Sequence, residues 1–186
     1  MEKIITLKLH SGGALGSDIA WETIGEEFGM TMFNHYFIKG FGTPHGNREM
    51  EIDTELMKQI DADLFKANKT LKRSYPTRNE YVNSLLRRNW FQVKNAKAVY
   101  AISSIENNLV NGGTGWAVQM AIDKRIPVFV YCQTFKKWYR YSLGAWSSIE
   151  TPMIITENFA GIGTREITED GLQAIRSVYQ KTLSNE

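Results

Sequence analysis

The stretch His10–Asp18, HSGGALGSD, places three glycines between a strand-like run, residues 4–9, and a helix-like run that begins DIAWETIGEEFG. Glycine has no Cβ, so a turn that contains it can adopt positive φ and lets another group approach the main chain closely. The first N–H groups of a helix attract anions, so this turn is either a tight structural connection or a phosphate cradle. Its G-G-x-x-G spacing is neither the dinucleotide fingerprint nor a P-loop, and alone it does not separate the two.

Composition describes an ordinary globular chain. With 186 residues, 42% of them apolar, and a net charge of +2, we expect one domain over residues 1–186. Cys132 is the only cysteine, and His10, His35 and His45 lack metal-ligand spacing. We therefore expect neither a metal nor a cofactor. No stretch approaches the ~20 apolar residues of a membrane span, which favours a cytoplasmic protein without a membrane partner.

Strand-like and helical patterns alternate along the chain. The strand-like runs are residues 4–9, 31–38, 97–102, 126–131 and 152–155, and the helical patterns are 17–28, 49–67, 79–95, 114–124 and 168–183. The alternation predicts an α/β fold: a Rossmann-like, mostly parallel sheet of about five strands with helices on both faces. The runs 98–102 and 126–131 are apolar on both alternating faces, as expected for central strands.

Three of the predicted loops are rich in glycine: residues 11–18, 111–119 and 159–171. Ligands of parallel α/β sheets bind beyond the carboxyl ends of the strands, in loops of this kind. One such loop is a turn, whereas three that open on the same edge favour a site for a nucleotide or another phosphate-bearing ligand.

The sequences SGGALGSD, NGGTGWAVQMA and FAGIGTR together resemble the SLOG superfamily, a Rossmann-like group that includes LOG phosphoribohydrolases, DprA-type proteins and nucleotide-sensing domains. The resemblance covers residues 4 to 178 approximately. In DprA-like members the Ser-Gly-Gly-Ala loop follows the Gly-x-Gly/Ser-Arg turn, whereas here it precedes Gly161–Arg165. This order looks like a circular permutation, and it implies that the first and last strands lie side by side.

The resemblance implies one ligand pocket shared by these loops and one helix. The residues it assigns to the ligand are Ser11, Gly12, Gly13, Asp18, Arg88, Asn89, Gly112, Gly113, Thr114, Gly115, Trp116, Gln119, Gly161, Gly163, Thr164 and Arg165. For Asp18 two roles stay open, because a carboxylate at a helix start either complements the dipole or bonds ribose hydroxyls.

Gln119 stands where LOG enzymes carry a catalytic glutamate. A glutamine cannot accept a proton as a carboxylate does, nor stabilise an oxocarbenium ion by charge. This departure favours binding over hydrolysis, and we expect no catalytic residue. The alternative is a LOG-like hydrolase or transferase at an N-glycosidic bond, with Asp18 or Glu166 as its acid.

In the helical segment 79–95, Asn89 falls inside the apolar stripe and Arg88 flanks it, while Arg87 points further out and is expected to be solvated. Asn89 either bonds neighbouring backbone or faces the ligand beside Arg88. The basic stretch 66–88 is interpreted as a flap over a compact anion rather than a nucleic-acid surface, because acidic residues crowd the preceding segment.

Aromatic residues gather in the segment 135–146, FKKWYRYSLGAW. Such residues stack on a base or, more commonly, fill a subunit interface or cover the core. By resemblance to the sensing members of the superfamily, we expect a homo-oligomeric binder of an ADP-ribose-like or cyclic-nucleotide signal. The resemblance also implies a phage-type anti-defence role, in which the protein sequesters an immune messenger.

Overall fold

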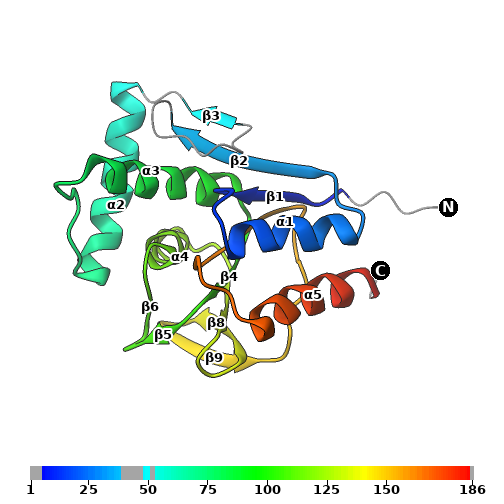
Figure 1. Ribbon diagram of the computed structural model, residues 1–186. Coiled ribbons are helices and arrows are strands. Elements are labelled where there is room, and N and C mark those ends of the chain that lie inside the picture. The colour runs from blue at the N-terminus through cyan, green and yellow to red at the C-terminus, as the bar shows by residue number, and fades with distance from the viewer. Residues whose placement is uncertain (1–5, 39–47, 51–52, 185–186) are drawn as a thin grey trace.

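The computed structural model describes residues 6–38, 48–50 and 53–184, which form an α/β fold (Figure 1). The helices are α1 (Ser17–Glu27), α2 (Thr54–Leu71), α3 (Glu80–Asn95), α4 (Thr114–Asp123) and α5 (Glu169–Ser184). The strands are β1 (Lys8–Ser11), β2 (Met32–Ile38), β3 (Arg48–Met50), β4 (Ala98–Ser103), β5 (Ile105–Glu106), β6 (Leu109–Val110), β7 (Val128–Cys132), β8 (Lys137–Ser142), β9 (Ala145–Ile149) and β10 (Asn158–Gly163).

Within the described residues, the main sheet has eight strands in the order β3-β2-β1-β10-β4-β7-β8-β9. The six strands from β3 to β7 in this order are parallel, and the β8–β9 hairpin continues the sheet antiparallel. The predicted Rossmann-like, mostly parallel class is therefore confirmed. The sheet is wider than about five strands because β3 and the hairpin extend its two edges.

The first and last strands of the main sheet are neighbours, but the last strand is β10 and not the predicted run 152–155. Strand β1 pairs with β10 in parallel, with Lys8 opposite Asn158 and His10 opposite Ala160. Of the predicted first strand, residues 4–5 lie outside the described residues, and the observed strand begins at Lys8.

The predicted strand 152–155 is wrong. The N–H of Ile154 donates to Oγ1 of Thr182 at 2.8 Å, and that of Ile155 donates to the Tyr100 hydroxyl at 3.0 Å. Because these backbone groups pair with side chains instead of a neighbouring strand, the ladder begins only at Asn158.

The predicted helix 49–67 also begins later than expected. Asp53 caps α2 by accepting the N–H of Leu56 at 2.8 Å, so the helix starts at Thr54. Residues 51–52 lie outside the described part of the chain, and Arg48–Met50 form the short strand β3.

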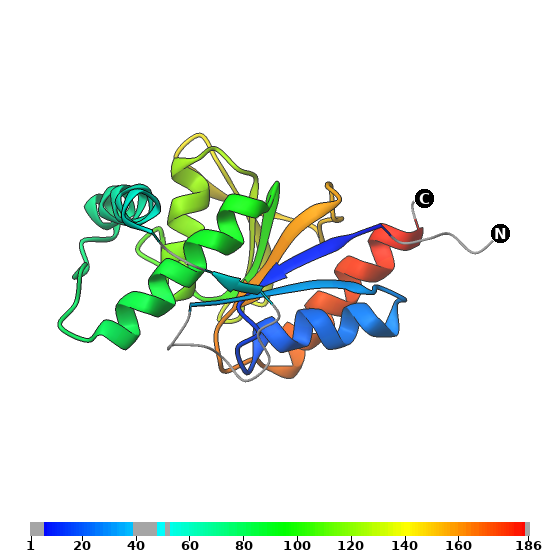
Figure 2. The same cartoon turned by 90° about the horizontal axis from the view of Figure 1, so that it is seen from above.

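Helices cover both faces of the sheet (Figure 2). One core packs α2, α3 and α4 against one face, where strand β4 contributes Val99 and Ala101. The other core packs α1 and α5 against the opposite face, where β4 contributes Tyr100 and Ile102. This alternation explains why the run 98–102 is apolar throughout.

The aromatic segment 135–146 forms most of the β8–β9 hairpin. Trp138 is buried in the core, and the rings of Tyr141 and Trp146 pack on each other with centroids 5.0 Å apart. Phe135 and Leu143 are exposed at its two ends. Part of the segment thus covers the core.

The order of the strands reverses at the middle of the sheet. From β1 the chain moves outward to β2 and β3, whereas from β4 it moves the other way to β7, and β10 fills the position between β1 and β4. Such a switch point, at the carboxyl ends of the strands, is where ligands bind in open α/β sheets. None of the helices in the described residues is long and apolar enough to cross a lipid bilayer.

Candidate functional site

A pocket of about 590 Å³ lies at this switch point, between α3 and the loops that follow β1, β6 and β10. Its volume falls within the range of small-molecule sites. Ten of the residues that the sequence assigned to a ligand line it: Gly13, Asp18, Arg88, Asn89, Gly112, Gly113, Thr114, Gly163, Thr164 and Arg165. All three glycine-rich segments therefore contribute to one pocket.

Asp18, in the first turn of α1, ties two of these segments together. One carboxylate oxygen accepts the N–H of Gly12 at 3.1 Å, and the other accepts the N–H of Gly163 at 3.2 Å. Burial raises the pKa of Asp18, and the charge of Arg88 and the backbone N–H donors oppose that rise. The carboxylate thus has a structural role beyond complementing the helix dipole.

The start of α1 also packs directly on the turn after β10. Both the N–H and the hydroxyl of Ser17 donate to the carbonyl of Thr164, at 3.0 and 2.8 Å. Gly16 has φ 98°, and a Cβ there would lie 2.0 Å from the carbonyl oxygen of Arg165. A Cβ at Gly163 would lie 2.4 Å from a backbone oxygen of β4. These two glycines are therefore required by close packing.

Two buried polar side chains of α3 form the pocket floor: Arg88, which is 8% exposed, and Gln92, which is 2% exposed. Neither makes a side-chain hydrogen bond or ion pair with any residue of the described ranges, and Nε of Arg88 is fully buried. Burial lowers the pKa of Arg88, and the Asp18 carboxylate acts against this. An arginine stays charged in proteins, so the pocket floor carries a positive charge. This guanidinium has no hydrogen-bonded anion among the described residues.

Gly12 makes room for the pocket floor. A Cβ at this position would lie 2.5 Å from Nε2 of Gln92 and 2.8 Å from Cζ of Arg88. Gly12 does not line the pocket itself, but it allows the guanidinium and the amide to lie over the backbone. Ser11, which is fully buried, also lies behind the pocket lining.

The glycine pair Gly112–Gly113 differs from the other glycines because open space surrounds it. No atom lies within 4 Å of a Cβ built at either position, and Gly112 has φ 62°. Gly113 precedes α4 without a side-chain cap. The N–H groups of Gly115 and Trp116 donate to the carbonyls of Asn111 and Gly113, so the N–H groups of Gly113 and Thr114 are the ones left for an anion at this helix start.

Side chains from the loop after α2 and from α3 hold this glycine pair in place. Arg73 donates to the carbonyls of Gly112 and Val110 at 2.7 and 2.8 Å, and Asn89 donates to the carbonyl of Gly113 at 3.2 Å. Of the two alternatives for Asn89, the bond to neighbouring backbone is therefore present, and the residue lines the pocket as well.

Four other assigned residues lie outside the pocket lining. A Cβ at Gly115 would lie 2.1 Å from the Val110 carbonyl oxygen, and Trp116 is buried against the ring of Tyr75. Gly161 lies inside β10, where Trp21 packs closely over it.

Gln119 is the fourth of these residues. It is buried and donates to Asp123 at 2.9 Å. Thr114 and Ala117 line the pocket, and Gln119 follows Thr114 by five residues, a rotation of about 140° around the helix. The position matched to the LOG glutamate therefore faces away from the pocket.

Sequence reasoning missed several lining residues, chiefly Leu15, Tyr81, Leu85 and Gln92. On α3 a signal was present. Residues 81, 85, 88 and 92 are spaced by four, three and four positions, so they share one helical face. That face carries a tyrosine, an arginine and a glutamine, which is unusual for a helix side that packs on a sheet.

The basic stretch 66–88 forms the end of α2, the connection to α3 and the first part of α3. Arg73 holds the glycine pair, and Arg87, which was expected to be solvated, has a 13% exposed side chain. Arg87 forms ion pairs with Glu80 and with Asp61, the latter at 3.7 Å.

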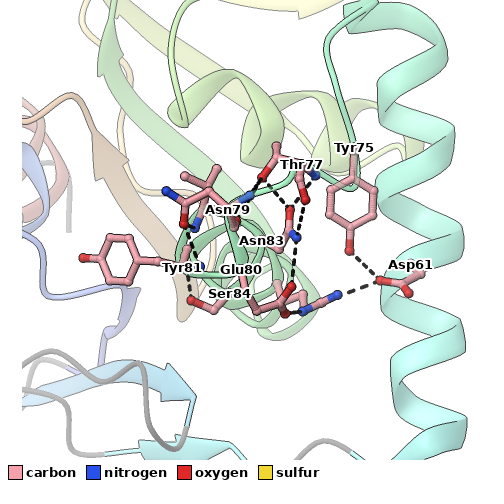
Figure 3. A network of polar contacts seen from close by, with 10 residues as sticks. Asp61, Tyr75, Thr77, Asn79, Glu80, Tyr81, Asn83 and Ser84 are labelled. Atoms are coloured by element: carbon pink, nitrogen blue, oxygen red, sulfur yellow. Dashed lines mark hydrogen bonds and ion pairs between the residues drawn. The ribbon is translucent and has the colours of Figure 1, made fainter.

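These ion pairs belong to a polar network that joins α2 to the start of α3 (Figure 3). The Tyr75 hydroxyl donates to Asp61 at 2.5 Å, and both burial and this bond raise the tyrosine pKa. Asn79 caps α3 by accepting the N–H groups of Tyr81 and Val82. The network fixes the helix that carries the pocket floor.

Comparison of the chain with family models, with curated proteins and with solved structures finds no significant match. The class of protein that the fold and the pocket define is a Rossmann-like α/β protein with a pocket at the switch point of its sheet. The SLOG resemblance rests on the three glycine-rich segments alone.

Proposed function

We propose that this protein binds a nucleotide-derived, phosphate-bearing small molecule in the pocket and does not cleave it. The observation that carries the proposal is Arg88, a buried guanidinium that lines the pocket without a hydrogen-bond partner among the described residues. Burying a guanidinium without hydrogen-bond acceptors is costly, so an anionic ligand group that accepts its N–H groups would complete the structure.

The glycine pair supports the same proposal. Gly112 and Gly113 leave the main chain open at the uncapped start of α4, and they line the same pocket as Arg88. Helix N-termini and guanidinium groups both bind phosphate, the first through main-chain N–H groups and the second through charge-assisted hydrogen bonds.

Binding without cleavage is supported by the arrangement of the carboxylates. Asp18 lines the pocket, but its two oxygens accept main-chain N–H groups, and Glu166 is not part of the lining. The alternative function, a LOG-like hydrolase or transferase, is favoured by one observation. Burial raises the pKa of Asp18, as a general acid requires.

The remaining parts of the proposal come from the resemblance. The ligand would be an ADP-ribose-like or cyclic-nucleotide signal, and the biological role would be to sequester an immune messenger, as phage anti-defence proteins do. We place this activity in the cytoplasm and in a homo-oligomer, with the exposed ends of the β8–β9 hairpin at or near the interface.

The proposal is tested with Arg88→Met, which keeps an unbranched side chain as far as the position of Nε and removes the charged end of the guanidinium. AMP, ADP-ribose and cyclic AMP are titrated, and a ligand at 100 times its Kd is expected to stabilise the fold by about 2.7 kcal/mol. Arg88→Met should lower the affinity about tenfold or more while the protein stays folded. Arg78→Met, on an exposed arginine near the same helix, is the matched control and should bind normally.

Mass spectrometry of the bound fraction separates binding from cleavage. Recovery of the intact nucleotide supports the proposal, whereas release of free base at catalytic rates supports the hydrolase. No thermal shift with any of the three nucleotides would contradict both functions.

A further inference from the structure

The pocket mouth is apolar, in contrast to its floor. The pocket mouth consists of Leu15, in the β1–α1 loop, and Tyr81, in the first turn of α3. Both residues line the pocket, and they are 69% and 54% exposed. Between mouth and floor the lining includes Val82, Leu85 and Ile162. One end of the pocket is thus suited to a charge and the other to an apolar surface.

The backbone of Tyr81 is fixed while its ring is available. Its N–H donates to the Asn79 side chain at 3.0 Å, and its carbonyl accepts the Ser84 hydroxyl at 2.7 Å. The ring stacks on no aromatic residue of the described ranges, and Figure 3 shows it pointing away from the network that holds the start of α3. An anchored tyrosine of this kind offers a flat surface at little entropic cost.

The spacing of the two ends limits the size of the ligand. Tyr81 and Arg88 are seven residues apart on one face of α3, which separates them by about 10 Å along the helix axis. An elongated ligand spans this axial separation more readily than a compact anion such as phosphate. A sugar phosphate bound at Arg88 would leave the apolar lining facing water.

We infer that the ligand is elongated, with an anionic end at Arg88 and a planar aromatic ring at the pocket mouth, between Tyr81 and Leu15. The inference rests on the proposed function and deepens it. The ligand class is a nucleotide whose base stacks on Tyr81, and neither a free anion nor a sugar phosphate belongs to it.

The test uses AMP and ribose 5-phosphate, which share the sugar phosphate and differ at C1, where AMP carries adenine and ribose 5-phosphate a hydroxyl group. The wild-type protein should bind AMP at least about tenfold more tightly than ribose 5-phosphate, because stacking on an aromatic side chain contributes a factor of this order. Tyr81→Ala should remove that advantage and leave the affinity for ribose 5-phosphate unchanged. Tyr81→Phe, which keeps the ring, and Phe135→Ala, an exposed aromatic residue on the hairpin, should leave both affinities unchanged.

The outcomes separate this inference from the proposed function. If both compounds bind but the wild-type protein does not prefer AMP, or if Tyr81→Ala weakens neither or both equally, the stacking role is wrong and the anion site stands. If neither compound binds to the wild-type protein, the proposed function fails and the inference fails with it. The comparison of wild-type affinities does not depend on the folding of any variant.

Discussion

Two glycine-rich regions border the pocket, and they use glycine for opposite reasons. At the junction of β1, α1 and β10, Gly16 and Gly163 have backbone oxygens within 2.4 Å of any added Cβ. At Gly112 and Gly113, an added Cβ would meet nothing within 4 Å. The first region is a packed junction that positions the floor, and the second leaves main chain open to a ligand. Glycine-rich motifs alone do not distinguish these two uses.

The largest effect should come from Gly16→Ala, which tests the packed junction. The substitution adds a methyl group against the carbonyl of Arg165 and strains a residue at φ 98°. We expect a loss of about 3 kcal/mol in the free energy of unfolding, measured by urea titration. Gly144→Ala is the matched control, because Gly144 has φ 85° with open space around it, and it should cost about 1 kcal/mol. Equal losses would show that the junction is not tightly packed.

A smaller effect concerns Asp18, whose carboxylate joins both parts of the packed junction. Burial raises its pKa above the ordinary value of 3.8, so above that pH the folded protein retains a proton that the unfolded chain has released. The contribution of Asp18 to stability is therefore fully present below pH 3.8 and declines as the pH rises through the folded pKa.

Urea titrations of the wild-type protein and of Asp18→Asn at several pH values check this sign. The stability of the wild-type protein relative to the variant should decrease as the pH rises. In an Arg88→Met background the decrease should extend to higher pH, because the charge that opposes the pKa rise is absent. A relative stability that increases with pH would contradict the assignment.

The smallest effect on stability is expected at the open glycine pair. Gly113 has a helical φ of −62°, so Gly113→Ala should change the free energy of unfolding by less than about 0.5 kcal/mol. Gly113→Asp should fold equally well but lower the affinity for AMP about tenfold, since it places a negative charge at the start of α4. Isothermal titration of both variants measures this difference. Equal affinities would remove the glycine pair from the site.

Much of the fold could be predicted from the sequence because its helices and central strands have clear periodicity. The β8–β9 hairpin could not. Its two-residue turn consists of Leu143 and Gly144, both with positive φ, at 50° and 85°. The sequence signal for such a turn is Asn or Asp in the first position, followed by Gly. Here the first position is Leu143, so the signal is absent. The segment was therefore interpreted only as a set of aromatic residues.

The candidate site was predictable as a set of loops but not in its detail. Gly161 was placed in the loop 159–171, after the predicted strand 152–155, whereas it lies inside β10, where Trp21 packs closely over it. Gln119 was matched by spacing along the chain, and spacing does not show which helical face a residue occupies. Gln92 and Tyr81 carry no motif, and only the face they share with Arg88 reveals them.

The position of β10 also determines when the pocket can exist during synthesis. Strands β1 and β4 each have one side that only β10 can pair, and β10 begins at residue 158. While the nascent chain is shorter, Asp18 lacks the N–H of Gly163 and the pocket lacks Thr164 and Arg165. Completing the sheet and completing the ligand site are therefore a single late step, and a ligand that reaches this pocket meets a chain whose central sheet has already closed.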